Sequence, residues 1–312
     1  MIENNMKKIS VIIPMKNESE NVQIIIENLL LVLSKISLDY ELVFVNDGST
    51  DNTLDLLLEL QKGNSKIRII DLSRNFGKEA AVYAGFENCT GDCAICVDAD
   101  LQDPPQMITE MVEHWFNGYE IVIAVRSSRS SDGILKKYTA QWFYNLINRM
   151  SNTKLVANAG DYRLLDRLAV NAFLQLGEKV RFNKGIFSWI GFQQKLVYHE
   201  RSERVAGKTK WNYLQLLRLA LDGITSFSTV PLTLCLYSGI IIALLSFLYA
   251  CYYAIKTILF GIDVNGYPSL LLFVLFFGGI QMIGIGILGQ YIGRIFLETK
   301  NRPIYIARKI HN

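Results

Sequence analysis

Two long stretches near the C-terminus contain no charged side chain, and they constrain the fold more than any other feature. The first covers residues 223–254 and the second covers residues 264–293. Each exceeds the roughly 20 apolar residues that a helix needs to cross a bilayer. Two buried core helices are the alternative, but core helices are usually shorter and carry polar positions. The sequence therefore predicts a hairpin of two transmembrane helices over residues 227–293.

Basic side chains flank both stretches, whereas the loop between them, residues 256–268, carries one Lys and one Asp. The flanking residues are Arg201, Arg204, Lys208, Lys210 and Arg218 on one side, and Arg294, Lys300, Arg302, Arg308 and Lys309 on the other. By the positive-inside rule, both ends of the hairpin face the cytoplasm. Residues 294–312 then form a basic cytoplasmic tail. Lys7 and Lys8 precede only a short apolar run, so we expect no signal peptide.

Residues 206–226, which lead into the hairpin, have an amphipathic pattern. The apolar positions at helical spacing are Trp211, Leu214, Leu217 and Leu221, with Lys210 and Arg218 at the polar margins. This pattern favours a helix that lies in the membrane interface, and an ordinary surface helix is the alternative. The net charge of +3 is too small to indicate a nucleic-acid partner.

The first half of the chain alternates apolar, β-rich runs with helical patterns. Strands are expected over residues 9–13, 41–45, 67–72, 93–97 and 120–125, and helices over residues 18–36, 54–60, 78–87 and 105–117. Further on, residues 137–150 have a helical pattern, and residues 161–167 are typical of a short strand that leads into a helix. The alternation predicts an α/β domain over residues 1–205, with a mostly parallel sheet flanked by helices on both faces.

Polar clusters follow four of the expected strands, where ligands bind on sheets of this kind. The clusters are residues 16–18, 46–49, 73–78 and 98–103. In the last cluster, Asp98, Asp100 and Gln102 offer three oxygen ligands, and Asp47 lies at a neighbouring strand end. Such hard ligands suit Mg²⁺ or Mn²⁺ bound to a diphosphate, whereas solvated loop carboxylates are the alternative. We therefore expect a metal site made of Asp98, Asp100 and Gln102.

Other common chemistries find little support in the sequence. His114, His199 and His311 are scattered without metal-binding spacing, and no Ser/His/Asp arrangement is visible. Among the five cysteines, Cys89, Cys93 and Cys96 have no fourth ligand nearby, so we interpret them as buried, reduced thiols.

Six motifs together resemble family 2 glycosyltransferases with the GT-A fold. They cover residues 11–18 (VIIPMKNE), 46–51 (NDGSTD), 75–78 (NFGK), 98–105 (DADLQDPP), 161–167 (DYRLLDR) and 204–211 (RVAGKTKW). The chain is most similar to the polyprenyl-phosphate branch, which includes dolichyl-phosphate mannose synthases and bactoprenol glucosyltransferases. The resemblance extends over essentially the whole chain. Lys16 and Asn46 depart from the usual aromatic and Asp of this branch, which bears on nucleotide affinity rather than on the reaction.

The resemblance implies a role for each matching residue. Those expected to bind the nucleotide sugar are Pro14, Asn17, Glu18, Asp47, Lys78, Asp98 and Arg126. Those expected to bind the acceptor phosphate are Arg126, Arg204 and Lys210, because a planar arginine fork suits phosphate oxygens. The expected catalytic residues are Asp100, Asp161, Arg204 and Lys210. A phosphate nucleophile is already anionic at neutral pH, so Asp161 is expected to orient the reactants rather than to act as an essential base.

The reaction that the resemblance implies is inverting transfer of a hexose to polyprenyl (undecaprenyl) phosphate. Glucose from UDP-glucose is the first expectation, and GDP-mannose, UDP-aminoarabinose derivatives and UDP-N-acetyl sugars remain open. The resemblance also implies Mg²⁺ or Mn²⁺ as cofactor, a location in the bacterial inner membrane and a homo-oligomer such as a tetramer. A processive polysaccharide synthase is disfavoured because its Gln-x-x-Arg-Trp motif is absent from the sequence. A non-enzymatic lipid carrier or flippase is a further alternative.

Overall fold

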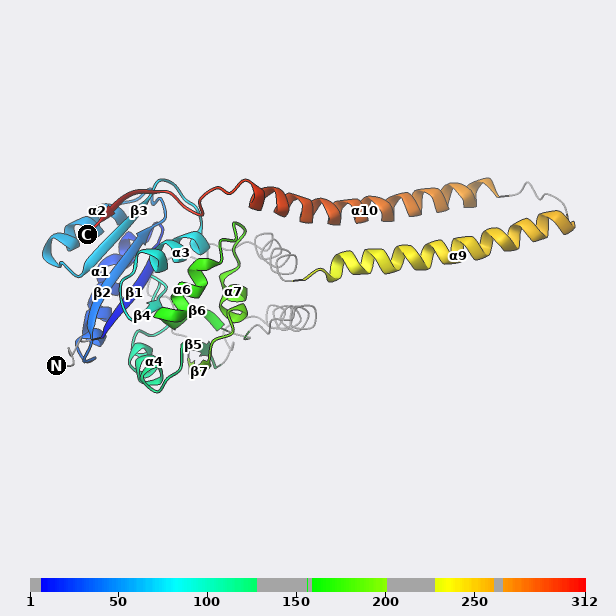
Figure 1. Cartoon of the computed structure of the whole chain (residues 1–312). Coiled ribbons are helices and arrows are strands. Elements are labelled where there is room, and N and C mark those ends of the chain that lie inside the picture. The colour runs from blue at the N-terminus through cyan, green and yellow to red at the C-terminus, as the bar shows by residue number, and fades with distance from the viewer. Residues whose placement is uncertain (1–6, 128–155, 157–158, 201–227, 261–265) are drawn as a thin grey trace.

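The computed structural model describes residues 7–127, 156, 159–200, 228–260 and 266–312 (Figure 1). The central sheet has the strand order β7-β5-β6-β4-β1-β2-β3-β8. Its strands are β1 (Lys8–Met15), β2 (Asp39–Asn46), β3 (Ile67–Leu72), β4 (Cys93–Cys96), β5 (Ile121–Arg126), β6 (Ala159–Asp166), β7 (Gln194–His199) and β8 (Ala307–His311). The helices are η1 (Ser19–Asn21), α1 (Val22–Leu33), α2 (Thr53–Gly63), α3 (Lys78–Asn88), α4 (Met107–Phe116), α6 (Arg167–Gln175), α7 (Asn183–Trp189), α9 (Val230–Phe260) and α10 (Tyr267–Thr299).

Most neighbouring strands are parallel, which confirms the predicted α/β class. Strand β1 pairs in parallel with β2 and β4, β2 pairs in parallel with β3, and β5 pairs in parallel with β7. Strand β6 runs antiparallel between β4 and β5, and β8 runs antiparallel to β3 at the edge. Neither antiparallel direction was predicted, because an apolar run does not encode the direction of a strand. The expected helix over residues 137–150 lies outside the described residues.

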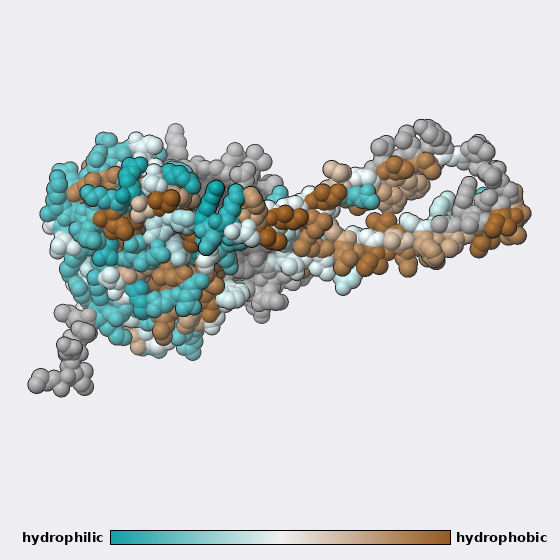
Figure 2. All heavy atoms as spheres, turned by 45° about the horizontal axis from the view of Figure 1, so that its top comes forward, coloured by the Kyte–Doolittle hydropathy of each residue, from teal (hydrophilic) through white to brown (hydrophobic). Residues whose placement is uncertain are grey.

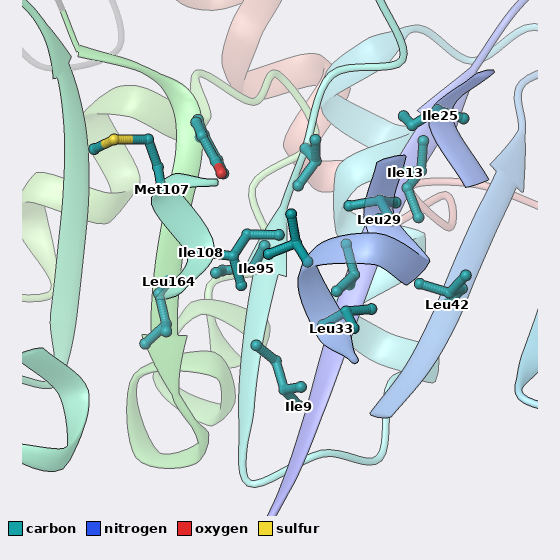
Figure 3. Close-up of a cluster of buried hydrophobic side chains, with 14 of the residues drawn as sticks. Ile9, Ile13, Ile25, Leu29, Leu33, Leu42, Ile95, Met107, Ile108 and Leu164 are labelled. Atoms are coloured by element: carbon teal, nitrogen blue, oxygen red, sulfur yellow. The ribbon is translucent and has the colours of Figure 1, made fainter. Parts of the chain in front are cut away.

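Apolar side chains cover both faces of the sheet, as expected. On β1, Val11 and Ile13 point to the face covered by α1 and α4, whereas Ile12 points to the face covered by α3, α6 and α7. Figure 3 shows the first of these clusters, in which Ile25 and Leu29 of α1 pack near Ile13. The period of two along a central strand therefore builds two cores from one run of residues. Cys89, Cys93 and Cys96 are buried free thiols, as predicted.

Helices α9 and α10 extend together away from the sheet, as a long pair (Figure 1). Both are long and apolar enough to cross a membrane, over Val230–Tyr249 and Phe276–Thr299, and neither segment is buried inside the protein. Figure 2 shows the apolar surface that they expose. Near the sheet, the Tyr291 hydroxyl donates a hydrogen bond of 2.7 Å to the carbonyl oxygen of Ser228. The predicted interfacial helix over residues 206–226 lies outside the described residues.

After α10 the chain returns to the sheet and adds strand β8 to its edge. The Glu298 carboxylate accepts a hydrogen bond of 2.8 Å from the backbone N–H of Lys179. Tyr305 then packs on α3, where its hydroxyl donates to Glu87 and accepts from the Asn88 side chain. The basic segment of residues 294–312 therefore contains the end of α10 and a strand, neither of which its sequence pattern predicted.

Gly85 of α3 lies directly against Ile12 of β1, and this contact gives a stability prediction. A Cβ atom built at Gly85 would lie 2.2 Å from Cγ2 of the fully buried Ile12, so we expect Gly85→Val to overpack the core. Overpacking of this kind costs about 1–3 kcal/mol, or about 2–4 °C of Tm per kcal/mol in a domain of this size. Gly63→Val is the matched control, because no heavy atom lies within 4 Å of the added Cβ. Thermal unfolding in detergent should separate the two variants, and equal Tm values would contradict the prediction.

Candidate active site

The loop that follows β4 carries the three expected metal ligands. Asp98 and Asp100 are partly exposed, whereas Gln102 is buried. The backbone N–H of Gln102 donates a hydrogen bond of 3.3 Å to Asp100 Oδ1, and Leu101 between them has a φ of 52°. Gln102 Oε1 is buried and makes no hydrogen bond with any described residue. A tight turn thus brings two carboxylates and an unsatisfied amide oxygen to one strand end.

Lys78, the first residue of α3, joins two carboxylates: Asp98 lies in the loop after β4, and Asp161 lies in β6. Its Nζ lies 2.6 Å from Asp98 Oδ1 and 2.7 Å from Asp161 Oδ2. Asp161 reaches this position because β6 lies beside β4, where Arg163 pairs with Cys96. The Asp161 side chain is 11% exposed and that of Asp98 is 27% exposed. The sheet therefore brings together three residues that the sequence placed in separate motifs.

The pKa values of the two carboxyl groups that share Lys78 are shifted in opposite directions. Burial raises the pKa of Asp98, and the nearby Asp161 adds to this effect although Lys78 opposes it. Burial also acts to raise the pKa of Asp161, but the positive charges of Lys78 and Lys184 outweigh it and lower that pKa. Next to Lys78, burial and then the charge of Asp161 raise the pKa of Glu79 to about 7. Asp161 is thus the most firmly ionised carboxylate of this group.

Asp47 holds the loop before α3 rather than pointing freely into solvent. Its carboxylate accepts hydrogen bonds of 2.7 Å and 3.0 Å from the backbone N–H groups of Phe76 and Gly77. Gly48 permits this close approach: it has a φ of +61°, and a Cβ there would lie 2.5 Å from the backbone nitrogen of Asn75. The expected nucleotide residue Asp47 therefore shapes the loop that presents Lys78.

Asn46 has a structural reason to be an amide rather than an acid. Its side-chain nitrogen donates a hydrogen bond of 2.8 Å to the buried Asp71 carboxylate, and its oxygen accepts from the backbone N–H of Ser49. An aspartate at this position would face the negative charge of Asp71 and would lose the donor.

Pro14, Asn17 and Glu18 lie at the neighbouring strand end, where β1 pairs with β2. Pro14 pairs with Val45, and Asn17, with a φ of 52°, accepts a hydrogen bond of 2.8 Å from the backbone of Thr50. The Glu18 carboxylate accepts from the Asn21 side chain. These three residues and Asp47 therefore lie at the same carboxyl edge of the parallel strands as Lys78, Asp98 and Asp161, which we call the Lys78 group.

Arg126 ends β5 beside a buried pair that sequence reasoning missed. Asp103 Oδ1 lies 2.9 Å from His199 Nε2 and 3.5 Å from Arg126 Nε. Burial alone would raise the pKa of Asp103, but the hydrogen bond from His199 and the charge of Arg126 lower it. Asp103 belonged to a recognised motif, but nothing in the sequence connected it with His199. The other expected phosphate ligands, Arg204 and Lys210, lie outside the described residues.

Comparisons with known proteins identify the family. Residues 10–174 match the family model described as glycosyl transferase family 2. The chain belongs to glycosyl transferase family 2. This glycosyltransferase is 48% identical over 96% of its length to an uncharacterised glycosyltransferase of Synechocystis, which is covered to 94%. It is 46% identical to a prophage bactoprenol glucosyl transferase homologue of Escherichia coli, over 97% of this chain and 99% of the other.

A third relative, the bactoprenol glucosyl transferase of Shigella phage SfII, is 46% identical over 97% of the glycosyltransferase and 98% of its own length. Among solved structures, mannosyl-3-phosphoglycerate synthase from Rubrobacter xylanophilus has a TM-score of 0.48 and 18% identity, over 69% of this chain and 71% of that chain. The predicted family is thus confirmed by full-length relatives in sequence.

The donor set of this family 2 glycosyltransferase fits a hard divalent cation. Asp98 and Asp100 offer carboxylate oxygens, and Gln102 Oε1, which is buried without a hydrogen-bond partner among the described residues, offers a neutral one. Oxygen ligands of this kind suit Mg²⁺ or Mn²⁺. Among the described residues, no group of three Asp, Glu, His or Cys side chains is gathered as a metal site, and Lys78 pairs with Asp98 instead.

Proposed function

We propose that this protein transfers a hexose, with glucose from UDP-glucose as the first candidate, to polyprenyl phosphate. The observation that carries the proposal is the Lys78 group at the carboxyl edge of the sheet, in a family 2 chain that also has two membrane-length helices. Relatives named bactoprenol glucosyl transferase, similar over nearly the full length, support undecaprenyl phosphate as the acceptor.

In this mechanism the chain's own residues bind and orient both substrates. Pro14, Asn17, Glu18 and Asp47 hold the nucleoside part, and Asp98, Asp100 and Gln102 would hold Mg²⁺ or Mn²⁺. A cation at that position would offset negative charge on the departing diphosphate. Lys78 offsets the mutual repulsion of Asp98 and Asp161 and adds positive charge beside that leaving group. Because the acceptor phosphate is already anionic, Asp161 orients the reactants and accepts no essential proton.

The acceptor is a lipid, and the proposed arrangement brings its phosphate to the enzyme at the membrane surface. We infer that Arg126, Arg204 and Lys210 bind this phosphate, with residues 206–226 in the interface and residues 227–293 as the membrane hairpin. The catalytic domain of residues 1–205 and the tail of residues 294–312 then lie on the cytoplasmic side of a bacterial inner membrane. The flanking basic residues support this topology. Assembly as a homo-oligomer, such as a tetramer, belongs to the same proposal.

The test is transfer of labelled sugar to undecaprenyl phosphate in detergent micelles. UDP-glucose, GDP-mannose, UDP-N-acetylglucosamine and a UDP-aminoarabinose derivative are supplied in parallel, and the lipid product is separated by chromatography. We expect transfer from UDP-glucose, with an inverted anomeric configuration in the product. Faster transfer from another donor would assign that donor, and not UDP-glucose, as the substrate. Lipid movement between leaflets of a vesicle, without consumption of any donor, would favour a carrier or flippase instead.

Arg204→Ala separates acceptor binding from donor binding. If Arg204 binds the lipid phosphate, we expect the KM for polyprenyl phosphate to rise about tenfold, as is typical for loss of one charge-assisted hydrogen bond. The Kd for UDP-glucose, measured by calorimetry, should stay unchanged. An unchanged acceptor KM, or a weakened donor Kd, would contradict this role.

A further inference from the structure

Asp103, His199 and Arg126 form a compact polar cluster, and the mechanism above gives a role to Arg126 but none to Asp103 or His199. Their side chains meet where the loop after β4 contacts the ends of β5 and β7, the first two strands in the sheet order given above. The side chains of Asp103 and His199 are each only 3% exposed, and Arg126 is 24% exposed. A buried carboxylate is costly unless it is paired, so this cluster needs a reason.

The cluster connects the loop after β4 with the ends of β5 and β7, and two of these segments carry proposed ligands, Gln102 and Arg126. Asp103 directly follows the metal ligand Gln102, so its carboxylate anchors the end of that loop. His199 and Arg126 are paired neighbours, as the last residues of β7 and β5. The backbone N–H and the hydroxyl of Ser127 both donate hydrogen bonds of 2.9 Å to the carbonyl oxygen of His199. Hydrogen bonds and an ion pair therefore join the three segments directly.

The direction of the hydrogen bond follows from the partners. An ionised Asp103 carboxylate only accepts, so His199 Nε2 carries the hydrogen and donates to Oδ1 at 2.9 Å. The same oxygen faces Arg126 Nε, which is buried and makes no hydrogen bond within the described part of the chain. His199 thus fixes the carboxylate oxygen with which the guanidinium group forms an ion pair at 3.5 Å. His199 Nδ1 is buried too and has no hydrogen-bond partner among the described residues.

We propose that His199 is a positioning residue that acts through Asp103 to aim the Arg126 guanidinium at a substrate phosphate. This inference rests on the proposed function, in which Arg126 binds a phosphate of the donor or of the lipid. Both sources present the same anionic oxygens, for which a preoriented arginine fork is suited. If His199 sets the orientation of the Arg126 guanidinium group, then loss of His199 weakens binding of that phosphate. The other residues proposed for the chemical step stay in place.

Two substitutions at His199 distinguish positioning from packing. The side-chain amide nitrogen of His199→Gln lies where Nε2 was, and that of His199→Asn lies nearer to the position of Nδ1. We expect His199→Asn to raise the KM for one of the two phosphate substrates about tenfold, the size of one lost hydrogen bond to a charged group. His199→Gln should stay within about threefold of wild type, since it keeps the donor to Asp103. The substrate whose KM changes identifies the phosphate.

A double-mutant cycle then tests the route through Arg126. In an Arg126→Ala background, His199→Asn should cause no further rise in KM, because the group it positions is gone. The isosteric Asp103→Asn should reproduce the KM change of His199→Asn, and it serves as the second variant if His199→Asn folds poorly. Equal KM values for the Gln and Asn variants, or a full tenfold effect without Arg126, would overturn the inference.

Calorimetry on the same variants keeps the two proposals separate. The Kd values of UDP-glucose and of polyprenyl phosphate are measured without any need for turnover. If the wild-type protein binds these ligands but transfers no sugar, then the proposed function fails, and the ratio of Kd between the Asn and Gln variants still decides the role of His199. A ratio of one would reject that role, and a ratio of about ten would support it.

Discussion

Lys78→Met is expected to reduce kcat at least about 100-fold, which corresponds to about 2.7 kcal/mol of transition-state stabilisation. The Lys78 ammonium group lies within 2.7 Å of both Asp98 and Asp161, and methionine keeps much of the volume but none of the charge. The two carboxylates would then repel each other with no cation between them. Single-turnover transfer assays measure this loss directly, because they separate chemistry from product release.

The same substitution should make the residual activity depend on pH. Burial already raises the pKa of Asp98, and removal of Lys78 takes away the largest charge that opposes this rise. A carboxyl group with a raised pKa is ionised only above that pKa, so the activity of Lys78→Met should increase as the pH rises and fall as it drops. The wild-type profile should be flatter over the same range. If the pH profile of Lys78→Met had the same shape as that of the wild-type protein, it would contradict this explanation of the lost activity.

Lys62→Met is the matched control for Lys78→Met. Lys62 is exposed near the end of α2, and methionine replaces a lysine in both variants. The Lys62→Met variant should retain wild-type kcat. Lys78→Arg keeps the charge but replaces a compact point charge by a planar fork, so we expect intermediate activity. Wild-type kcat in Lys78→Met would remove Lys78 from the proposed mechanism.

Asp100→Asn is expected to lower turnover about 100-fold at limiting metal concentration, since a neutral amide oxygen replaces a carboxylate ligand. The side chain keeps its shape and can still accept the hydrogen bond from the backbone of Gln102. Higher Mn²⁺ should therefore restore part of the activity. The measurement is the rate of sugar transfer against Mn²⁺ concentration, together with Mn²⁺ binding followed by electron paramagnetic resonance.

Asp92→Asn supplies the control for Asp100→Asn. Asp92 is an exposed carboxylate just before β4, at the opposite end of that strand, and it accepts a hydrogen bond of 2.7 Å from the backbone of Lys8. Its substitution should leave the metal dependence unchanged. If Asp100→Asn also had the wild-type dependence on Mn²⁺, then Asp100 would not be a metal ligand. Treatment with a chelator should stop transfer by the wild-type protein and by the control alike.

The elements with strong local patterns were predictable from the sequence. Strand β1 is a run of apolar residues bounded by Lys8 and Met15, and the helix α1 that follows has apolar residues at helical spacing. The two membrane-length helices were equally clear, because charge is absent over many turns. The convergence of Asp47, Lys78 and Asp98 followed from one rule, since the ends of parallel strands meet at one edge.

The remaining features depend on contacts that are distant in the sequence. Asp103 and His199 are 96 residues apart and meet only because β7 pairs with β5. Strand β8 has the sequence ARKIH, whose charged residues mask its strand character, and it lies at an edge where such residues are tolerated. The bridge from Lys78 to Asp161 required the antiparallel placement of β6, which no periodicity specifies.

The helix pair α9 and α10 lies in the chain between β7 and β8, and both of these strands belong to the same sheet. Glu298, in the last turn of α10, and Tyr305, between α10 and β8, hydrogen-bond to the domain, so the helix pair has a second attachment in addition to the covalent link before α9. Two anchors restrict swivelling far more than one. The protein itself would then set the distance between a bilayer and the carboxyl edge of the parallel strands. A long lipid would have to bring its phosphate to a site at a fixed distance from the membrane.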